Sequence, residues 1–377
     1  MPLGARTSEV AGREIGFAPV SFDDLPGWHA DDHLDAFRAF VRSVAAIARV
    51  PGGSTGKTRR ANERLVALAA DAARLGDSIA TREAAKAFFE TSFVPHRIVH
   101  DRAPGLLTGY YEPVLPGARA PDGLYRFPVY RRPADLVNLV GEQERGALAD
   151  GLTHARKTAS GSIEPYATRA DIDAGALDGQ GLEFVWLADA VDTFFMHIQG
   201  SGRIRFADGS TTRVTYDGKN GHPYTSIGRY LIDQGHFTAD EMTLDALKVW
   251  LAADAARGRR VMQENRSFVF FRELAREDDG PLGALEIPLS PGRSLAVDTA
   301  FHALGAPIYV SAAELQPWRA GESFARLMIA QDVGSAIRGP ERGDIYFGSG
   351  DEAGRLAGST KHAGTFFALL PSADGPP

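Results

Sequence analysis

The sequence predicts a mainly β protein that begins with a helical segment of about 100 residues. Three observations lead to this fold class. Apolar residues recur at helical spacing before Thr91. From Leu106 onwards, short β-branched and aromatic runs alternate with glycine-rich connections. Most of these runs are only about four to six residues long, which favours a β-barrel or β-sandwich over a doubly wound sheet.

The N-terminal part contains signals for three helices. The first has an apolar face made by Leu34, Phe37, Phe40, Val41, Val44 and Ile47. A second helix is expected over Asn62–Leu75, with Gly76 just after its end. A third is expected over Arg82–Phe89, with Thr81 as its N-cap.

The middle of the chain mixes both element types. Strands are expected at Glu183–Leu187, Asp192–Ile198, Arg203–Phe206 and Thr211–Tyr216, and Asp208-Gly209 indicates a hairpin between the last two. Helices are expected over Ser226–Gln234 and Ala239–Ala256, the latter opened by a capping box of Thr238 and Glu241. Strands then dominate, at Phe268–Phe271, Leu295–Val297, Pro307–Val310, Leu327–Ile329, Asp344–Phe347 and Thr365–Leu370.

Composition excludes several classes of function. The chain of 377 residues is 44% hydrophobic and 24% charged, which is typical of a folded globular protein with about two or three domains. Its net charge of −7 argues against a nucleic-acid partner. The absence of cysteine excludes disulfides, zinc–thiolate sites, iron–sulfur clusters and a cysteine nucleophile. No apolar run is long enough to predict a transmembrane helix.

Some motifs resemble functional sites but are better explained as ordinary structure. Residues Pro51–Thr58 nearly match a phosphate-binding loop, yet they lack its first glycine and follow a helix. The pairs His29/His33 and His96/His100 have metal-ligand spacing without a third ligand, so we expect neither a metal nor a cofactor. Asn265-Arg-Ser is expected to be a turn that enters a strand, and no nucleophile elbow for serine hydrolysis is present.

Three aspartates stand at strand edges in the C-terminal third: Asp298, Asp332 and Asp344. Each lies between an apolar run and small residues. Burying a carboxylate costs several kcal/mol unless it has a partner. Any one of them is more simply explained as a turn or cap residue, but the three together suggest a shared site.

These aspartates lie in segments that resemble the membrane-bound lytic murein transglycosylase A family. Its three-aspartate module is similar to Gln331–Gly339, Gly343–Gly348 and Ala353–Gly358. Further similar segments follow in family order: Leu107–Pro113, Pro165–Arg169, Phe195–Gly202, Asn265–Phe271 and Pro288–Asp298. The resemblance covers about Leu106 to Leu370.

The resemblance implies a double-psi β-barrel with a second β-domain inserted into it. The barrel would comprise residues 106–113 and 274–377, and the inserted domain residues 114–273. The glycan would bind in the groove between the two domains. Residues 1–105 would form a helical part that packs on the barrel.

The resemblance also implies a reaction, the cleavage of peptidoglycan between N-acetylmuramic acid and N-acetylglucosamine with formation of a 1,6-anhydro ring. Asp344 matches the family's catalytic aspartate, and Asp332 and Asp298 match its two companions. One carboxyl group can suffice, because the sugar's own C6 hydroxyl attacks and the same residue serves first as acid and then as base. Substrate contacts are expected from Thr108, Gly109, Tyr110, Gln199 and Ser201, with weaker signals at Lys361 and His362.

Two alternatives remain open at this point. Asp332 and Asp344 could act as the carboxylate pair of a hydrolytic glycosidase, or the chain could be a glycan-binding module without catalysis. Family members are outer-membrane lipoproteins, whereas Met1–Gly12 shows no secretory leader and the chain has no cysteine to carry a lipid. We expect a periplasmic protein given without its leader, which acts on glycan strands, with other cell-wall enzymes as further partners. Exo or endo cleavage is left open.

Overall fold

The computed structural model describes residues 8–10, 13–47, 61, 63–101, 103–138, 152–274, 280–315 and 324–372. Pro51–Thr58, the near match to a phosphate-binding loop, lies outside these residues. The chain divides into two compact units. The first unit comprises residues 1–110, 282–348 and 360–377, and the second comprises residues 111–281 and 349–359. Strands make up most of the regular structure of the first unit, and the prediction of a mainly β protein with helices is confirmed.

One large sheet organises the first unit. Its strands run in the order β1-β2-β3-β19-β15-β16-β14-β17-β4-β18, and in the described strands this order does not close on itself. Their bounds are β1 Ser8–Val10, β2 Arg13–Pro19, β3 Phe93–Val99, β4 Leu106–Glu112, β14 Ser294–Val297, β15 Pro307–Ala312, β16 Phe324–Asp332, β17 Arg342–Ser349, β18 Lys361–Ala363 and β19 Thr365–Pro371.

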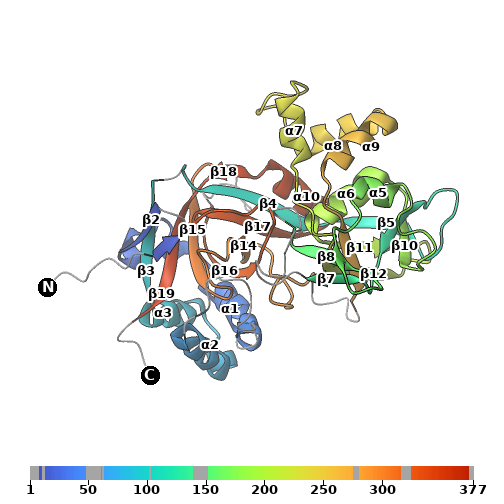
Figure 1. Cartoon of the computed structure of the whole chain (residues 1–377). Coiled ribbons are helices and arrows are strands. Elements are labelled where there is room, and N and C mark those ends of the chain that lie inside the picture. The colour runs from blue at the N-terminus through green and yellow to red at the C-terminus, as the bar shows by residue number, and fades with distance from the viewer. Residues whose placement is uncertain are drawn as a thin grey trace. The chain divides into compact units, whose positions relative to one another are not determined.

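Three helices pack against β15, β16 and β19 of this sheet, as Figure 1 shows for α1 and α2. They are α1 His33–Ile47, α2 Glu63–Leu75 and α3 Arg82–Ser92, which confirms the three helices predicted near these bounds. Thr81 caps α3 by accepting a hydrogen bond from the Ala84 N–H. The apolar faces of the helices meet strand residues such as Tyr309 and Ile329 in one buried core. This burial explains why the helical segment folds onto the sheet.

A buried ion pair fastens the start of α1 to the sheet. Both terminal nitrogens of Arg293 donate to the Asp31 carboxylate, over 3.0 and 2.9 Å, and Nε donates to Asp35 over 2.9 Å. The Leu327 N–H also donates to Asp31. Because Arg293 and Asp31 are both buried, the Asp31 charge depends on Arg293 for its partner.

The second unit combines two smaller sheets with a group of helices. One sheet has the order β13-β12-β11-β5-β10-β6 and the other β7-β8-β9. The strands are β5 Val114–Ala118, β6 Phe127–Tyr130, β7 Leu136–Asn138, β8 His154–Lys157, β9 Ile163–Glu164, β10 Glu183–Leu187, β11 Ser201–Arg205, β12 Thr211–Lys219 and β13 Val269–Glu273. The helices are α5 Arg169–Asp173, α6 Ala190–Gln199, α7 Ile227–Asp233, α8 Leu244–Ala252, α9 Ala255–Glu264 and α10 Gly350–Ser359. Helices α6 to α9 share one apolar core, and α7, α8 and α9 stand together in Figure 1.

The hairpin predicted at Asp208-Gly209 is confirmed, because β11 and β12 pair antiparallel around it. The strand predicted at Asp192–Ile198 is wrong, since these residues lie in α6. Asp189 caps this helix by accepting a hydrogen bond from the Asp192 N–H. The buried Val191, Phe194 and Phe195 follow helical spacing, which outweighs the β-propensity of aromatic residues.

The single helix predicted over Ala239–Ala256 is also wrong. Thr238 and Glu241 do exchange the hydrogen bonds of a capping box, yet they close only a turn. The helix α8 begins later and is capped by Thr243. It ends at Ala252, and Asp254 caps the separate helix α9. Across the described ranges, no helix combines the length and apolar character needed to span a bilayer.

Candidate active site

The sheet of the first unit brings two of the three aspartates to one face. Strand β14 lies between β16 and β17, and Ala296 of β14 pairs with Asp332 on one side and with Asp344 on the other. Residues that pair across strands point to the same face of a sheet. Asp332 and Asp344 therefore face the same way from backbones two strands apart, a spacing of about 10 Å.

A β-bulge is required for this arrangement. Ser294 pairs with Ile329 and Leu295 with Ala330, but Ala296 then pairs with Asp332, so that Gln331 is passed over. Regular alternation from Ile329 would turn Asp332 to the opposite face, since the two residues are an odd number of positions apart. The extra residue restores Asp332 to the face of Asp344.

Asp344 has a polar environment built by neighbouring strands. The Thr108 hydroxyl of β4 donates to Asp344 Oδ1 over 2.5 Å. Arg342 Nη2 in turn donates to Thr108 Oγ1 over 2.8 Å. A hydroxyl has only one hydrogen to donate, so the bond from Arg342 leaves that hydrogen directed at Asp344. Arg342 thus acts on Asp344 both by its charge and through the hydroxyl of Thr108.

Asp332 is held by three hydrogen-bond donors. The Ala284 and Val333 N–H groups donate to Oδ1 over 3.0 and 2.9 Å. The Tyr110 hydroxyl of β4 donates to Oδ2 over 2.8 Å. The carboxylate is therefore oriented from two sides, and both of its oxygens are engaged.

Burial raises the pKa of both aspartates. The pKa of Asp332 rises to about 6, because burial and the negative charge of Asp344 outweigh its hydrogen-bond donors. Burial also raises the pKa of Asp344, although the charge of Arg342 and the bond from Thr108 lower it in part. Burial and the nearby carboxylates raise the pKa of Tyr110 well above its usual value, so its hydroxyl stays protonated and donates. Raised carboxyl pKa values are what an acid needs near neutral pH.

Asp298 occupies a different position, just after β14. Its Oδ1 accepts from the Ala300 N–H over 3.1 Å and its Oδ2 from the Gly339 N–H over 2.8 Å. Gly339 lies in the loop that joins Asp332 to Asp344. Asp298 is buried and bonds to backbone, so it fastens that loop to the end of β14.

The expected substrate-binding residues of β4 surround these carboxylates. The hydroxyls of Thr108 and Tyr110 bond to Asp344 and Asp332, and Gly109 lies between them in β4. Lys361 of β18 pairs with Thr108 and so shares its face of the sheet. His362 pairs with Leu107, so its side chain points to the opposite face of the sheet from that of Lys361. Its Nδ1 accepts from the Lys361 N–H.

The other expected contacts belong to the second unit. Gln199 ends α6, and its Oε1 accepts from the Tyr111 N–H over 3.0 Å. Gly200 closes the helix with a φ of 76°, a left-handed conformation that favours glycine. Ser201 is buried in β11, where it pairs with Thr215.

The histidine pairs have separate structural surroundings. His29 lies 2.9 Å from Asp23, whereas His33 is buried against Trp28. His96 contacts the Val94 carbonyl, and His100 contacts Glu341. Within the described residues, no three His, Cys, Asp or Glu side chains form a group that could hold a metal ion. Asn265 is buried at the end of α9, and its Oδ1 accepts from two backbone N–H groups.

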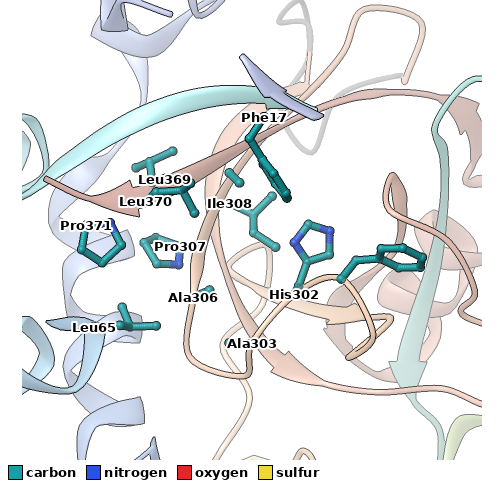
Figure 2. A pocket seen from close by; sticks show the side chains of 12 residues that line it. Phe17, Leu65, His302, Ala303, Ala306, Pro307, Ile308, Leu369, Leu370 and Pro371 are labelled. Carbon is teal, nitrogen blue, oxygen red and sulfur yellow. The ribbon is translucent and has the colours of Figure 1, made fainter. Parts of the chain in front are cut away.

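A small apolar cavity lies elsewhere in the first unit, and Figure 2 shows its lining. Its volume is about 50 Å³, and it is lined by residues that include Phe17, Leu65 and Ile308. His302 also lines it and contacts the Pro340 carbonyl through Nε2. A space of this size has room for about one or two water molecules. It is a gap in packing and is too small for a sugar ring.

Comparison with known proteins identifies the family. Residues 106–272 match the MltA specific insert domain, and residues 293–370 match the 3D domain. A crystal structure of membrane-bound lytic murein transglycosylase from Agrobacterium tumefaciens is 38% identical, with a TM-score of 0.86, and the alignment covers 94% of this chain and 97% of that one. The chain belongs to the membrane-bound lytic murein transglycosylase A family.

Two further relatives extend the comparison. The membrane-bound lytic murein transglycosylase A of Vibrio cholerae is 37% identical over 270 residues, which is 70% of this chain and 65% of that protein. The chain thus spans slightly less than two thirds of this curated relative. The crystal structure of Escherichia coli MltA with bound chitohexaose is 25% identical, with a TM-score of 0.66 and coverage of 100% of this chain and 95% of that one.

Within this lytic transglycosylase family, the matched ranges contain every catalytic and substrate-binding residue predicted from the sequence. The three aspartates, Lys361 and His362 fall in the 3D domain, and the five expected substrate contacts fall in the insert-domain match. Arg342 was missed, although it stands directly before Gly343-Asp-Ile-Tyr. A signal was present, since Arg342 lies two residues before Asp344 and strand alternation gives both the same face.

Proposed function

We propose that this protein is a lytic transglycosylase that cleaves the β-1,4 bond between N-acetylmuramic acid and N-acetylglucosamine in peptidoglycan. The observation that carries the proposal is the environment of Asp344, whose pKa is raised by burial while Thr108 orients its Oδ1. The names of the relatives support the proposal, because they are lytic murein transglycosylases. The chitohexaose bound to Escherichia coli MltA adds that a relative binds a β-linked sugar chain.

In the proposed mechanism, protonated Asp344 donates its proton to the glycosidic oxygen as the bond to the anomeric carbon breaks. The C6 hydroxyl of the muramic acid attacks that carbon and forms the 1,6-anhydro ring. The Asp344 carboxylate then takes the proton released by this hydroxyl, so the enzyme returns to its starting state. An attacking group within the same sugar has a high effective concentration, and no enzymatic nucleophile is needed.

Asp332 supports this cycle by charge rather than by attack. Three donors engage its two oxygens, which makes it a poor nucleophile or base for water. Electrostatic coupling between two carboxyl groups is mutual, so ionised Asp332 favours the protonated form of Asp344. Asp298 acts indirectly, because it fastens the loop that joins Asp332 to Asp344.

The glycan contacts are a further part of the proposal. Thr108 and Tyr110 lie beside the two carboxylates with Gly109 between them. Their hydroxyl oxygens and the aromatic ring of Tyr110 are groups of the kind that bind sugars. We assign Gln199 and Ser201 as supplementary contacts of the second unit, where buried Ser201 supports the backbone more than it offers its hydroxyl. Lys361, on the face of Thr108, would neutralise developing negative charge.

We also propose the finer architecture and cellular place that the family resemblance implies. Residues 106–113 and 274–377 would form a double-psi β-barrel, 114–273 an inserted β-domain, and 1–105 a helical part packed on the barrel. The protein would act in the periplasm, with the outer membrane as the attachment suggested by its membrane-bound relatives. Its partners would be glycan strands and other cell-wall enzymes.

The test is mass spectrometry of purified peptidoglycan after digestion by wild type, Asp344→Asn and the control Asp351→Asn. Asparagine has the shape of aspartate and can still accept the Thr108 bond, so the catalytic variant loses only the titrating group. Asp351 is an exposed aspartate of α10, and its variant controls for a change of one charge.

Anhydro-muropeptides from wild type and Asp351→Asn, with none from Asp344→Asn, are the expected result. Reducing ends would instead indicate a hydrolase. No products from wild type, together with glycan binding that survives Asp344→Asn, would indicate a binding module. Equal products from all three proteins would remove Asp344 from the mechanism.

A further inference from the structure

A buried polar side chain with several hydrogen bonds next to the site belongs to Gln331. It is fully buried, and its Nε2 donates to the Ala39 carbonyl and to Ser43 Oγ, each over 2.8 Å. Its Oε1 accepts a short hydrogen bond from Ser294 Oγ. Ala39 and Ser43 belong to α1, whereas Ser294 begins β14. The amide thus joins the N-terminal helical segment to the central strand of the site.

Gln331 is also the extra residue of the β-bulge that turns Asp332 toward the face of Asp344. A bulge residue has no ladder partner to hold it in place. Here the side chain supplies the missing restraint, because its three bonds go to two neighbouring elements. A further contact acts on the backbone, since Gly283 lies so close that a Cβ there would be 2.6 Å from the Gln331 carbonyl oxygen.

We propose that Gln331 is a positioning residue, whose bonds to α1 and β14 hold the bulge that places Asp332 on the face of Asp344. The N-terminal helical segment thereby takes part in the reaction without touching substrate. The inference about catalysis rests on the proposed function. The inference about Asp332 does not, because the direction of its carboxylate can be measured without turnover.

The readout is the Ala284 amide, which donates to Asp332 only while the carboxylate lies on this face. In wild type, the NMR shift of this amide is expected to titrate with the carboxylate, near the pKa of about 6 given to Asp332 by burial. Within the part of the chain that the structure describes, the titrating or charged groups that act on this carboxylate are Tyr110 and Asp344. Neither is changed in the variants below.

The variant Gln331→Met keeps the length and volume of the side chain and removes all three bonds. Ser43→Ala removes one acceptor and is the milder test. Asp35→Asn is the matched control, because it also weakens a polar contact between α1 and the sheet, by removing the carboxylate charge that pairs with Arg293, but leaves Gln331 untouched. Thermal unfolding establishes that each variant is folded.

In Gln331→Met the titration of the Ala284 amide is expected to disappear, and in Ser43→Ala to weaken. Asp35→Asn is expected to lose stability and to keep the titration. With an active enzyme, kcat of Gln331→Met falls by about tenfold to a hundredfold, the loss typical of a misplaced group, while KM changes little.

An unchanged Ala284 titration in folded Gln331→Met would overturn the proposal. If that variant does not fold, an unchanged titration in Ser43→Ala would do so, as would an equal loss in Asp35→Asn. Absence of anhydro products from wild type would count against the proposed function alone, since the Ala284 titration would still report on the bulge.

Discussion

The sharpest prediction concerns Arg342, which acts on Asp344 through space and through Thr108. The two hydrogen bonds that meet at Thr108 Oγ1 are 2.8 and 2.5 Å long, so the guanidinium nitrogen is at most about 5.3 Å from the carboxylate oxygen. At this distance two unit charges attract by about 1 to 3 kcal/mol, for effective dielectric constants between about 80 and 20. Arg342 is only half-buried, which favours the lower part of this range.

Removing the charge in Arg342→Gln is expected to raise the pKa of Asp344, because the positive charge stabilises only the ionised carboxylate. The first step needs protonated Asp344, so kcat/KM falls as pH rises through that pKa. The falling limb should therefore move to higher pH in Arg342→Gln. Its plateau should also fall, since Thr108 loses the partner that directs its hydroxyl.

The assay is the pH profile of kcat/KM for release of anhydro-muropeptides by wild type, Arg342→Gln and Arg342→Lys. Lysine keeps the charge and loses the planar fork, so its limb should stay near that of wild type while its plateau falls. A limb that stays in place or moves to lower pH in Arg342→Gln would refute the electrostatic reasoning. A plateau equal to wild type in both variants would refute the role of Thr108.

Three further predictions concern Asp332 and the stability of the fold. Asp332→Asn should raise the free energy of unfolding at pH 7 by about 3 kcal/mol, from the rise in pKa from 3.8 to about 6. Below about pH 4, Asp332 is protonated in both the folded and the unfolded chain, so urea unfolding should show no gain for Asp332→Asn there. The gain should grow as the pH rises from about 4 to about 6, because wild type loses stability over this range. Tyr110→Phe should raise the pKa of Asp332 further and lower the free energy of unfolding by about 1.5 to 3 kcal/mol, because the carboxylate loses a donor. A lower pKa of Asp332 in this variant would contradict the prediction. Arg293→Met should cost about 3 to 5 kcal/mol in urea unfolding, since buried Asp31 loses its partner; a loss below about 1 kcal/mol would mean that the pair is dispensable.

Local chemistry in the sequence was sufficient for several elements. The apolar face from Leu34 to Ile47 and the Thr81 cap predicted α1 and α3, because helical periodicity and capping depend on residues close in the chain. The Asp208-Gly209 hairpin followed from the same kind of signal. Two errors show its limit. Asp192–Ile198 has a strand-like composition but packs as a helix, and the capping box at Thr238 closes a turn that no helix continues.

In the candidate site, too, the sequence predicted the residues but not their surroundings. Motif order singled out Asp298, Asp332 and Asp344 and the family, because those residues stand in recognisable short segments. Their different environments could not be predicted. Asp332 is held by donors from three separate segments, whereas Asp298 bonds to backbone of a loop.

Residue types and their order along the chain were thus enough to predict a mainly β fold with helices, and the family. The tertiary structure decided which side chains meet. Thr108 and Asp344 are 236 positions apart, and Gln331 and Ser43 are 288 apart, yet each pair is hydrogen-bonded. Strand register and one bulge set these contacts, and a shift of a single residue would turn Asp332 to the other face of the sheet. Register depends on packing across the whole sheet, and no short segment of sequence contains that information.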